Sequence, residues 1–400
     1  MGANGLKTTQ DLITGLVHHP YEPPAGFGAV MPGVHKASTV TFPNTAAMRS
    51  RSWKSKQGYT YGLHGTPTTF TLEERIAALE GGRFCALAPS GLGAIVMTNI
   101  ALLKQGDELL LPSNVYGPSR EMARTLLTDW GITHRFYDPL AAASLAAAIG
   151  ERTKLVWLEA PGSVTMEFPD LRGLIAAARA RGVLTALDNT WGAGLAFRAF
   201  ELADGLGVDL VMQALTKYPS GGADVLMGSV VCNDEALHHR ILQAHMRLGI
   251  GVAANDAELV LRSLPTIALR YRAQDAAART LAAFLAQQPA IKRLLHPAFD
   301  GSPGHAFWRE SCGAAAGLFS VLLDPGLPIE RVDAFIDALR LFRIGYSWGG
   351  PVSLAVPYDL RLIRDDAAGA LQGPLVRFSV GLEAVGDLQA DLAQALRQLD

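Results

Sequence analysis

Val183–Trp191 reads VLTALDNTW, an apolar run that ends in the polar residues Asp188, Asn189 and Thr190. A short apolar run without strict polar alternation is typical of a strand buried on both faces of a sheet. Similar runs recur at Glu108–Leu111, Leu155–Leu158, Leu210–Met212 and Leu226–Val231. Together they predict a large, mostly parallel sheet.

Helical segments separate these predicted strands, and we expect them at Leu92–Leu103, Ser119–Leu127 and Leu171–Arg181. Asp170 can cap the N-terminus of the last helix, and Gly182 stands just past its end. Strands that alternate with helices predict an α/β fold, in which helices flank the sheet.

Both ends of the chain differ from this α/β part. Residues 1–65 contain prolines that break any long helix, so they are predicted to form an arm that needs a partner surface. Residues 66–253 form the predicted α/β domain. Residues 254–400 indicate a smaller α+β domain, with helices at Gln274–Gln287, Ile329–Leu341 and Leu388–Leu399 and strands at Leu318–Leu323 and Leu375–Val380.

Composition narrows the class of protein. Hydrophobic residues make up 49% of the chain and charged residues 18%, which excludes a disordered chain and a coiled coil. The net charge of −2 gives no general attraction to nucleic acid or anionic lipid, which favours a small-molecule partner. Met1–Val17 lacks a signal-peptide core, and no apolar stretch reaches the roughly 18 residues of a membrane span. We therefore expect a soluble, cytoplasmic protein.

The cysteines, Cys85, Cys232 and Cys312, are far apart and form no CxxC pair. This spacing argues against a disulfide framework and against a zinc site. We expect buried, reduced thiols and no bound metal.

Chemistry is expected just after the predicted strands, because ligands of open α/β sheets bind beyond the carboxyl ends of the strands. The candidate junctions are Pro89–Ala94, Glu159–Gly162, Asp188–Gly192 and Leu215–Tyr218. In the first, Ser90 and Gly91 precede an apolar helix whose free amides can bind a phosphate. The run Gly91–Val96 lacks the third small residue of a dinucleotide fingerprint, and a plain tight turn remains the alternative.

Asp188 and Lys217 are the candidate reactive groups. A carboxylate at the end of a buried strand is costly unless a cation faces it, and a protonated heterocycle nitrogen is such a cation; an N-cap is the alternative. A lysine in this place can carry a Schiff base, although a surface lysine also fits. With the phosphate-binding turn and the aromatic Tyr116, these groups supply what pyridoxal phosphate (PLP) needs.

On these residues the chain resembles the Cys/Met-metabolism family of fold-type I PLP-dependent enzymes. The resemblance runs from Tyr59 to Leu399, with a weaker match at Gly28–Phe42. Its motifs are Tyr59–Gly62, Leu79–Gly82, Pro89–Gly91, Leu158–Ser163, Asp188–Trp191, Ala214–Tyr218, Gly317–Ser320 and Tyr346–Gly350. It implies a fold-type I architecture with a large, mostly parallel sheet and a smaller C-terminal domain.

The resemblance also implies roles in cofactor binding. Lys217 would carry PLP through a Schiff base and act in catalysis, and Asp188 would pair with the pyridine nitrogen. Tyr116 would stack on the ring and take part in catalysis. The phosphate would be held by Gly91, Leu92 and Thr216, with Tyr61 reaching in from a neighbouring subunit.

Three further residues are implied to serve the substrate. Arg377 matches the arginine that binds the substrate α-carboxylate, a bidentate task that suits a planar guanidinium. Ser347 would orient the lysine amine, and Trp348 would line the substrate pocket, to which Tyr61 also contributes. Without the family pattern, Arg377 could equally be a half-exposed strand residue, and Tyr346–Gly350 only an aromatic turn.

The implied activity is that of a carbon-sulfur lyase of methionine biosynthesis and transsulfuration. It would β-eliminate L-cystathionine to homocysteine, pyruvate and ammonia, in a homotetramer with shared active sites. Three alternatives stay open: γ-chemistry on the same cofactor, a nicotinamide enzyme, and a non-catalytic scaffold.

The chain departs from the family pattern in two places. The family usually has an arginine two residues after the tyrosine of the arm, where it binds the neighbour's phosphate; here that residue is Leu63, followed by His64. Many relatives have Glu-Ser after the double glycine of the serine turn, whereas Gly349–Ser353 reads GGPVS. These differences affect one phosphate contact and the recognition of the distal part of the substrate.

Overall fold

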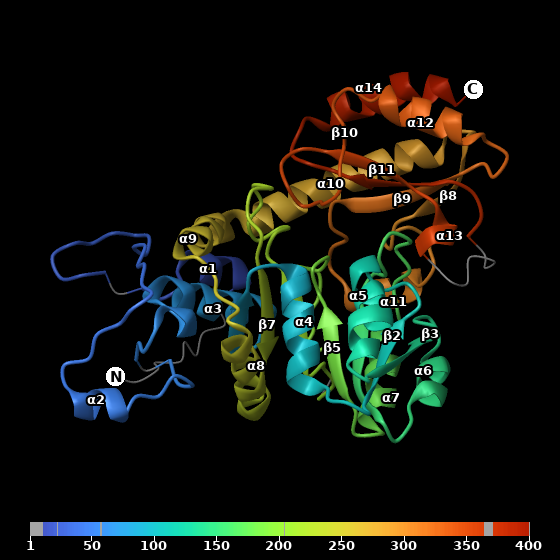
Figure 1. The fold of residues 1–400 in the computed structure, drawn as a ribbon. Coiled ribbons are helices and arrows are strands. Elements are labelled where there is room, and N and C mark those ends of the chain that lie inside the picture. Colours follow the sequence, from blue (N-terminus) through green and yellow to red (C-terminus); the bar gives the residue numbers. More distant parts are fainter. Residues whose placement is uncertain (1–10, 22, 57, 204, 364–370, 400) are drawn as a thin grey trace.

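The computed structural model describes residues 11–399, apart from residues 22, 57, 204 and 364–370 (Figure 1). A seven-stranded sheet has the order β1-β7-β6-β5-β4-β2-β3. The strands are β1 Phe84–Ala88, β2 Glu108–Pro112, β3 Thr133–Tyr137, β4 Thr153–Glu159, β5 Leu184–Asp188, β6 Leu210–Ala214 and β7 Gly228–Cys232. Only β7 runs antiparallel to its neighbours, so the predicted mostly parallel sheet is confirmed.

Helices cover both faces of this sheet. They are α3 Pro67–Glu80, α4 Gly91–Leu102, α5 Gly117–Met122 with its π-helical continuation Ala123–Leu127, α6 Ala142–Ala148, α7 Leu171–Arg179 and α8 Glu235–Leu248. Residues of α4, α5 and α8 share one apolar cluster with the sheet, whereas α3, α6 and α7 belong to the other. Asp170 caps α7 by accepting a 2.9 Å hydrogen bond from the amide of Gly173, as predicted.

A second sheet of five strands has the order β10-β11-β12-β9-β8 and packs against α10, α12 and α14 (Figure 1). Its strands are β8 Ile291–Leu295, β9 Leu318–Leu323, β10 Arg343–Ile344, β11 Leu354–Tyr358 and β12 Leu375–Ser379. The helices of this part are α9 Ala254–Ser263, α10 Ile267–Ala286, α11 His305–Ser311, α12 Ile329–Asp337, α13 Leu360–Ile363 and α14 Val385–Ala395. The expected α+β unit is therefore present, but its central helix α10 begins seven residues before the predicted Gln274.

The N-terminal segment lies along one side of the molecule with little regular structure (Figure 1). It holds α1 Leu12–Val17, α2 Thr45–Arg49 and the 3-10 turn Gly62–His64. Large apolar side chains stay open to solvent here, with Phe27 67% and Val30 87% exposed. Such exposure is typical of a surface that another chain covers.

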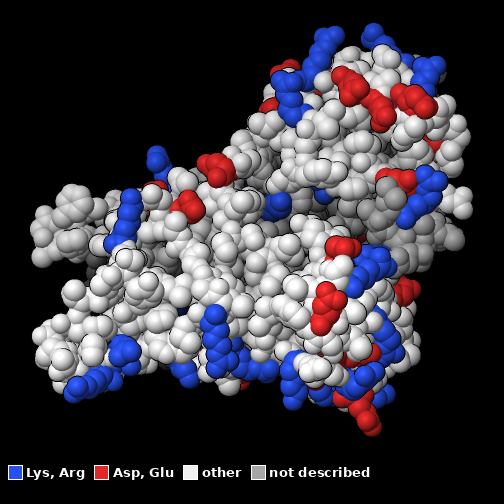
Figure 2. All heavy atoms as spheres, in the orientation of Figure 1, with Lys and Arg blue, Asp and Glu red and all other residues white. Residues whose placement is uncertain are grey.

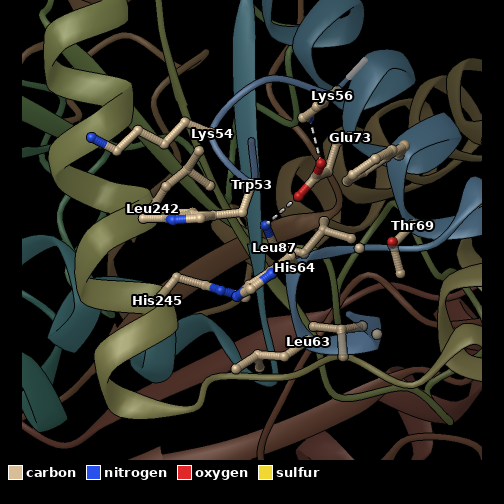
Figure 3. A pocket seen from close by; sticks show the side chains of 14 residues that line it. Trp53, Lys54, Lys56, Leu63, His64, Thr69, Glu73, Leu87, Leu242 and His245 are labelled. Carbon is tan, nitrogen blue, oxygen red and sulfur yellow. Dashed lines mark hydrogen bonds and ion pairs between the residues drawn. The ribbon is translucent and has the colours of Figure 1, made fainter. Parts of the chain in front are cut away.

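Figure 3 shows how the end of this segment is fixed to its own subunit. Lys56 forms an ion pair with the buried Glu73 of α3 and donates a 3.2 Å hydrogen bond to the carbonyl of Cys85. Leu63 and His64 line the same small pocket, together with His245 of α8. The pocket holds about 30 Å³, which leaves room for a water molecule rather than a metabolite.

Neither a spanning helix nor a metal cluster is found in the described residues. None of their helices is long and apolar enough to cross a membrane. They also contain no group of three or more His, Cys, Asp or Glu residues that could hold a metal ion.

Candidate active site

A cavity of about 590 Å³ lies between the carboxyl ends of the central strands of the large sheet and residues of the smaller sheet. This volume is within the range of small-molecule sites. The predicted residues that line it are Gly91, Leu92, Tyr116, Asp188, Thr216, Lys217, Ser347, Trp348 and Arg377. Tyr61 does not line it; this side chain lies on the N-terminal segment and is 48% exposed.

The turn before α4 closes one end of the cavity. Ser90 caps this helix by accepting a 2.9 Å hydrogen bond from the amide of Gly93. A Cβ atom on Gly91 would lie 2.6 Å from the Cβ of Ala214, so only glycine lets the helix start so close to β6. The first amides of α4 thereby face the cavity, an arrangement that suits an anion.

Thr216 stands beside this turn, but its hydroxyl is engaged with the main chain. It donates to the carbonyl of Met227 at 3.2 Å and accepts from the amide of Met227 at 3.0 Å. To donate to a phosphate, the hydroxyl hydrogen must turn away from that carbonyl.

Asp188 and Glu159 form the floor of the cavity. Two hydrogen bonds reach Asp188 from Thr190, one from the amide at 3.0 Å and one from the hydroxyl at 2.5 Å. Desolvation still raises the pKa of Asp188. Desolvation and the nearby Asp188 raise the pKa of Glu159 well above its usual value. Carboxyl groups in this state favour a cation or a proton as a partner.

Lys217 stands three residues past the end of β6 and is not a surface lysine. Its Nζ donates a 2.7 Å hydrogen bond to Oγ of Ser347 and lies 5.5 Å from the ring centroid of Trp348. Desolvation, with a contribution from the Arg377 charge, lowers the pKa of Lys217 to about 8. The neutral, nucleophilic form of the amine is therefore far more populated near neutral pH than in an ordinary lysine, although it becomes the major form only above pH 8.

Ser347 contacts Lys217 from the segment between β10 and β11 of the smaller sheet. Its backbone φ is +100°, a conformation that side-chain-bearing residues seldom adopt. Such conformations cluster at functional sites, where the surrounding structure enforces them.

Arg377 of β12 is a buried cation, with only 7% of its surface exposed. One of its terminal nitrogens donates a long, 3.4 Å hydrogen bond to the carbonyl of Ser347, and its Nε has no partner in the described part of the chain. Among the described residues, no carboxylate forms an ion pair with it. Because a buried charge needs a counter-ion, this site is prepared for an anion that enters the cavity.

Residues 13–397 match the family described as Cys/Met metabolism PLP-dependent enzymes. The chain belongs to this family. A putative cystathionine beta-lyase of Rhizobium johnstonii is 40% identical to it, with 97% of this chain and 96% of the relative covered. The cystathionine beta-lyase of Salmonella typhimurium is 35% identical, with 98% and 100% covered.

Solved structures also resemble the chain over nearly its whole length. Cystathionine gamma synthase from Xanthomonas oryzae pv. oryzae, crystallised with aminoacrylate and cysteine, is 30% identical with a TM-score of 0.89. The match covers 98% of this chain and 99% of that one. The predicted family, fold class and PLP cofactor are therefore confirmed, and the nicotinamide alternative loses its basis.

The residues present fit PLP. Gly91 leaves the amides of α4 open to a phosphate, Lys217 offers an amine with a lowered pKa, and Asp188 faces the cavity without a cation in direct contact. The aromatic face of Tyr116, at the start of α5, lines the cavity too.

Among the cavity residues that sequence reasoning missed are Asn114 and Tyr358. Asn114 follows β2 at its carboxyl end, so the rule that singled out the other junctions also applies to it. Tyr358 ends β11, a strand that was not predicted, and no motif marks it.

Proposed function

We propose that this protein is a PLP-dependent carbon-sulfur lyase that β-eliminates L-cystathionine, with one water, to homocysteine, pyruvate and ammonia. The observation that carries the proposal is the meeting of a low-pKa amine, Lys217, and an unpaired buried cation, Arg377, in one cavity. An amino acid bound there by its carboxylate presents its Cα proton to the lysine. The names of relatives at 35–40% identity support the choice of substrate.

PLP bound in this cavity supplies an electron sink for the negative charge that develops at Cα. We assign its attachment to Lys217 and the contact with its ring nitrogen to Asp188. Tyr116 would stack on its ring. The amides of Gly91 and Leu92 and the Thr216 hydroxyl would hold its phosphate.

In this proposal, three side chains from the C-terminal part of the chain, across the cavity from the large sheet, act on the substrate. Arg377 binds the α-carboxylate through two parallel hydrogen bonds, which fixes Cα. Ser347 accepts from the Lys217 ammonium and so holds its nitrogen in place. Once freed and neutral, that nitrogen removes the Cα proton, and the thiolate leaves from Cβ. Trp348 packs beside the Lys217 amine and lines the part of the cavity that would hold the leaving group.

γ-Chemistry on the same cofactor is the second candidate, because the solved structures that resemble the chain include a γ-synthase. The products decide between the two. The purified protein with L-cystathionine is expected to yield homocysteine and pyruvate. Cysteine and 2-oxobutyrate would instead assign it to γ-elimination, and no turnover by the PLP-loaded protein would favour a non-catalytic scaffold.

We further propose a homotetramer, a dimer of dimers, in which residues 1–65 act as an arm. Residues 66–253 and 254–400 would be the PLP-binding and C-terminal domains. Tyr61 is exposed and outside its own cavity, so it is free to complete the site of a neighbour. Figure 2 shows charged side chains mainly around the upper right, the lower right and the edges of this face, whereas much of its centre is uncharged, which is typical of a surface used in subunit contact.

Mixed assemblies test this sharing of sites. A Tyr61→Phe chain and a Lys217→Ala chain are each expected to be nearly inactive alone. Unfolded and refolded together, they would regain about a quarter of the activity if arms are exchanged, by random pairing. No recovery in a mixture that forms the normal oligomer would contradict the exchange. We place the reaction in cytoplasmic methionine biosynthesis, which rescue of a lyase-deficient methionine auxotroph would test.

A further inference from the structure

Tyr358 lies against Arg377 on the small sheet. Strands β11 and β12 are antiparallel, and Val356 is directly opposite Arg377. Tyr358 is two residues from Val356, so its side chain leaves the same face of the sheet as Arg377, one diagonal step away. The Arg377 Cζ is 5.3 Å from the centroid of the Tyr358 ring. This separation is within the range of a cation-π contact.

Among the groups around Arg377, the ring of Tyr358 is the main one that packs against the guanidinium. The phenols near the guanidinium belong to Tyr116, Tyr346 and Tyr358, and Lys217 is the other charged group that faces it. Tyr346 is 79% exposed and meets Tyr358 edge-on, with 6.4 Å between ring centroids. Tyr358 is more deeply placed. Desolvation raises its pKa, although the charge of Arg377 and a side-chain hydrogen bond with it act in the opposite direction, so the phenol stays neutral beside Arg377.

The hydrogen bonds of Arg377 do not fix it without such support. Its hydrogen bond to the carbonyl of Ser347 is 3.4 Å long, and Nε has no partner among the described residues. A free arginine side chain loses rotamer entropy when it binds a carboxylate, which weakens binding. A guanidinium that is already held against a ring loses this rotamer entropy when the protein folds. Less entropy is then lost when the carboxylate binds.

We propose that Tyr358 is a positioning residue that holds the Arg377 guanidinium in the plane needed to bind the substrate α-carboxylate. The ring face, rather than the hydroxyl, provides this support. The inference rests on the proposed function, in which Arg377 binds that carboxylate.

Two variants of the PLP-loaded protein separate ring from hydroxyl. Tyr358→Leu is expected to raise KM for L-cystathionine about 5- to 30-fold, the range of a partly desolvated cation-π contact, with kcat changed less than about threefold. Tyr358→Phe keeps the ring face and should stay within about threefold of the parent KM. Trp308→Leu is the matched control, because Trp308 also lies 5.3 Å from an arginine, Arg279, but away from the cavity. We expect this control to leave KM unchanged.

A binding measurement links the effect to the carboxylate. L-alanine carries the α-carboxylate but no leaving group, and L-alaninamide lacks the charge. Tyr358→Leu should weaken binding of L-alanine by the same factor as KM rises and change binding of L-alaninamide less than about twofold. Equal weakening of both ligands, an unchanged KM in Tyr358→Leu, or a defect as large in Tyr358→Phe would overturn the proposal. A parent protein that binds no PLP or releases no pyruvate would instead refute the proposed function.

Discussion

Glu159 and Asp188 are directly opposed partners on the neighbouring parallel strands β4 and β5, and both carboxyl groups face the floor of the cavity. Their hydrogen bonds are unequal. Asp188 accepts two from Thr190, which favour its charged form, whereas Glu159 accepts one, from the amide of Tyr116 at 2.8 Å. Since two adjacent carboxylates cannot both ionise cheaply, these hydrogen bonds favour the proton on Glu159 and the charge on Asp188.

This division predicts unequal effects of two isosteric substitutions. Asp188→Asn removes the charge that faces the cofactor ring, and we expect kcat to fall at least about 100-fold. Glu159→Gln resembles the protonated acid and keeps an acceptor for Tyr116, so kcat should fall less than about fivefold. Steady-state pyruvate release by the PLP-loaded variants measures both. Equal losses would show that Glu159 is ionised in the working enzyme.

Lys217 predicts a pH dependence for loading of the cofactor. Its pKa of about 8 means that the neutral amine, which attacks the aldehyde, is scarce below pH 8 and dominant above it. The rate at which the cofactor-free protein captures PLP should rise about tenfold per pH unit below 8 and level off above it. Appearance of the imine absorbance in stopped flow follows this rate.

Arg377→Met tests whether the charge of Arg377 contributes to the lowered pKa of Lys217. The Arg377 charge contributes to lowering the pKa of Lys217, so its removal should move the capture profile to higher pH. Arg309→Met removes a charge outside the cavity and serves as the control. A profile that stays in place in Arg377→Met would exclude coupling between the two cations.

The same substitution is expected to act oppositely on activity and stability. Loss of the cation should lower kcat/KM about 30-fold or more, because truncating one side of a buried charge pair costs about 2–5 kcal/mol. The substrate-free protein should unfold at a higher temperature, because a buried cation without a counter-ion is replaced by an apolar side chain. Calorimetry of the PLP-loaded, substrate-free form checks this; a lower Tm would mean that the contacts of Arg377 with Tyr358 and Ser347 outweigh the cost of burying its charge.

The strands that could be predicted from the sequence are those buried on both faces of a sheet. β9 matches its expected bounds Leu318–Leu323, because every residue of it is buried and all but Ser320 are apolar. Edge strands were missed: β3 reads THRFY and β8 reads IKRLL, with partly exposed polar positions that produce no apolar run. An apolar run also carries no direction, so the antiparallel placement of β7 was not predictable from it.

The candidate site was predicted where a motif adjoins a strand end, as at Asp188 and Lys217. Tyr358 was not predictable in this way, because its place beside Arg377 arises from pairing between β11 and β12, which are far apart in sequence from the cofactor motifs. Whether the Leu63 side chain points into its own subunit likewise depends on how the arm packs. The residue type alone indicated only that the positive charge of the family's usual arginine is missing at this position.

Leu63→Arg tests whether that missing arginine matters. Leu63 lines the pocket on its own subunit together with Lys56 and His64, so an arginine in this conformation would add a further basic group there (Figure 3). We expect Tm to fall by several degrees, and the dissociation constant for PLP to stay within about twofold, because the new charge does not face a neighbour's phosphate. Leu341→Arg, at a 38% exposed position of the small sheet unit, is the control for adding a surface charge. A clearly tighter PLP complex in Leu63→Arg with no loss of Tm would mean that residue 63 turns outward in the assembled protein.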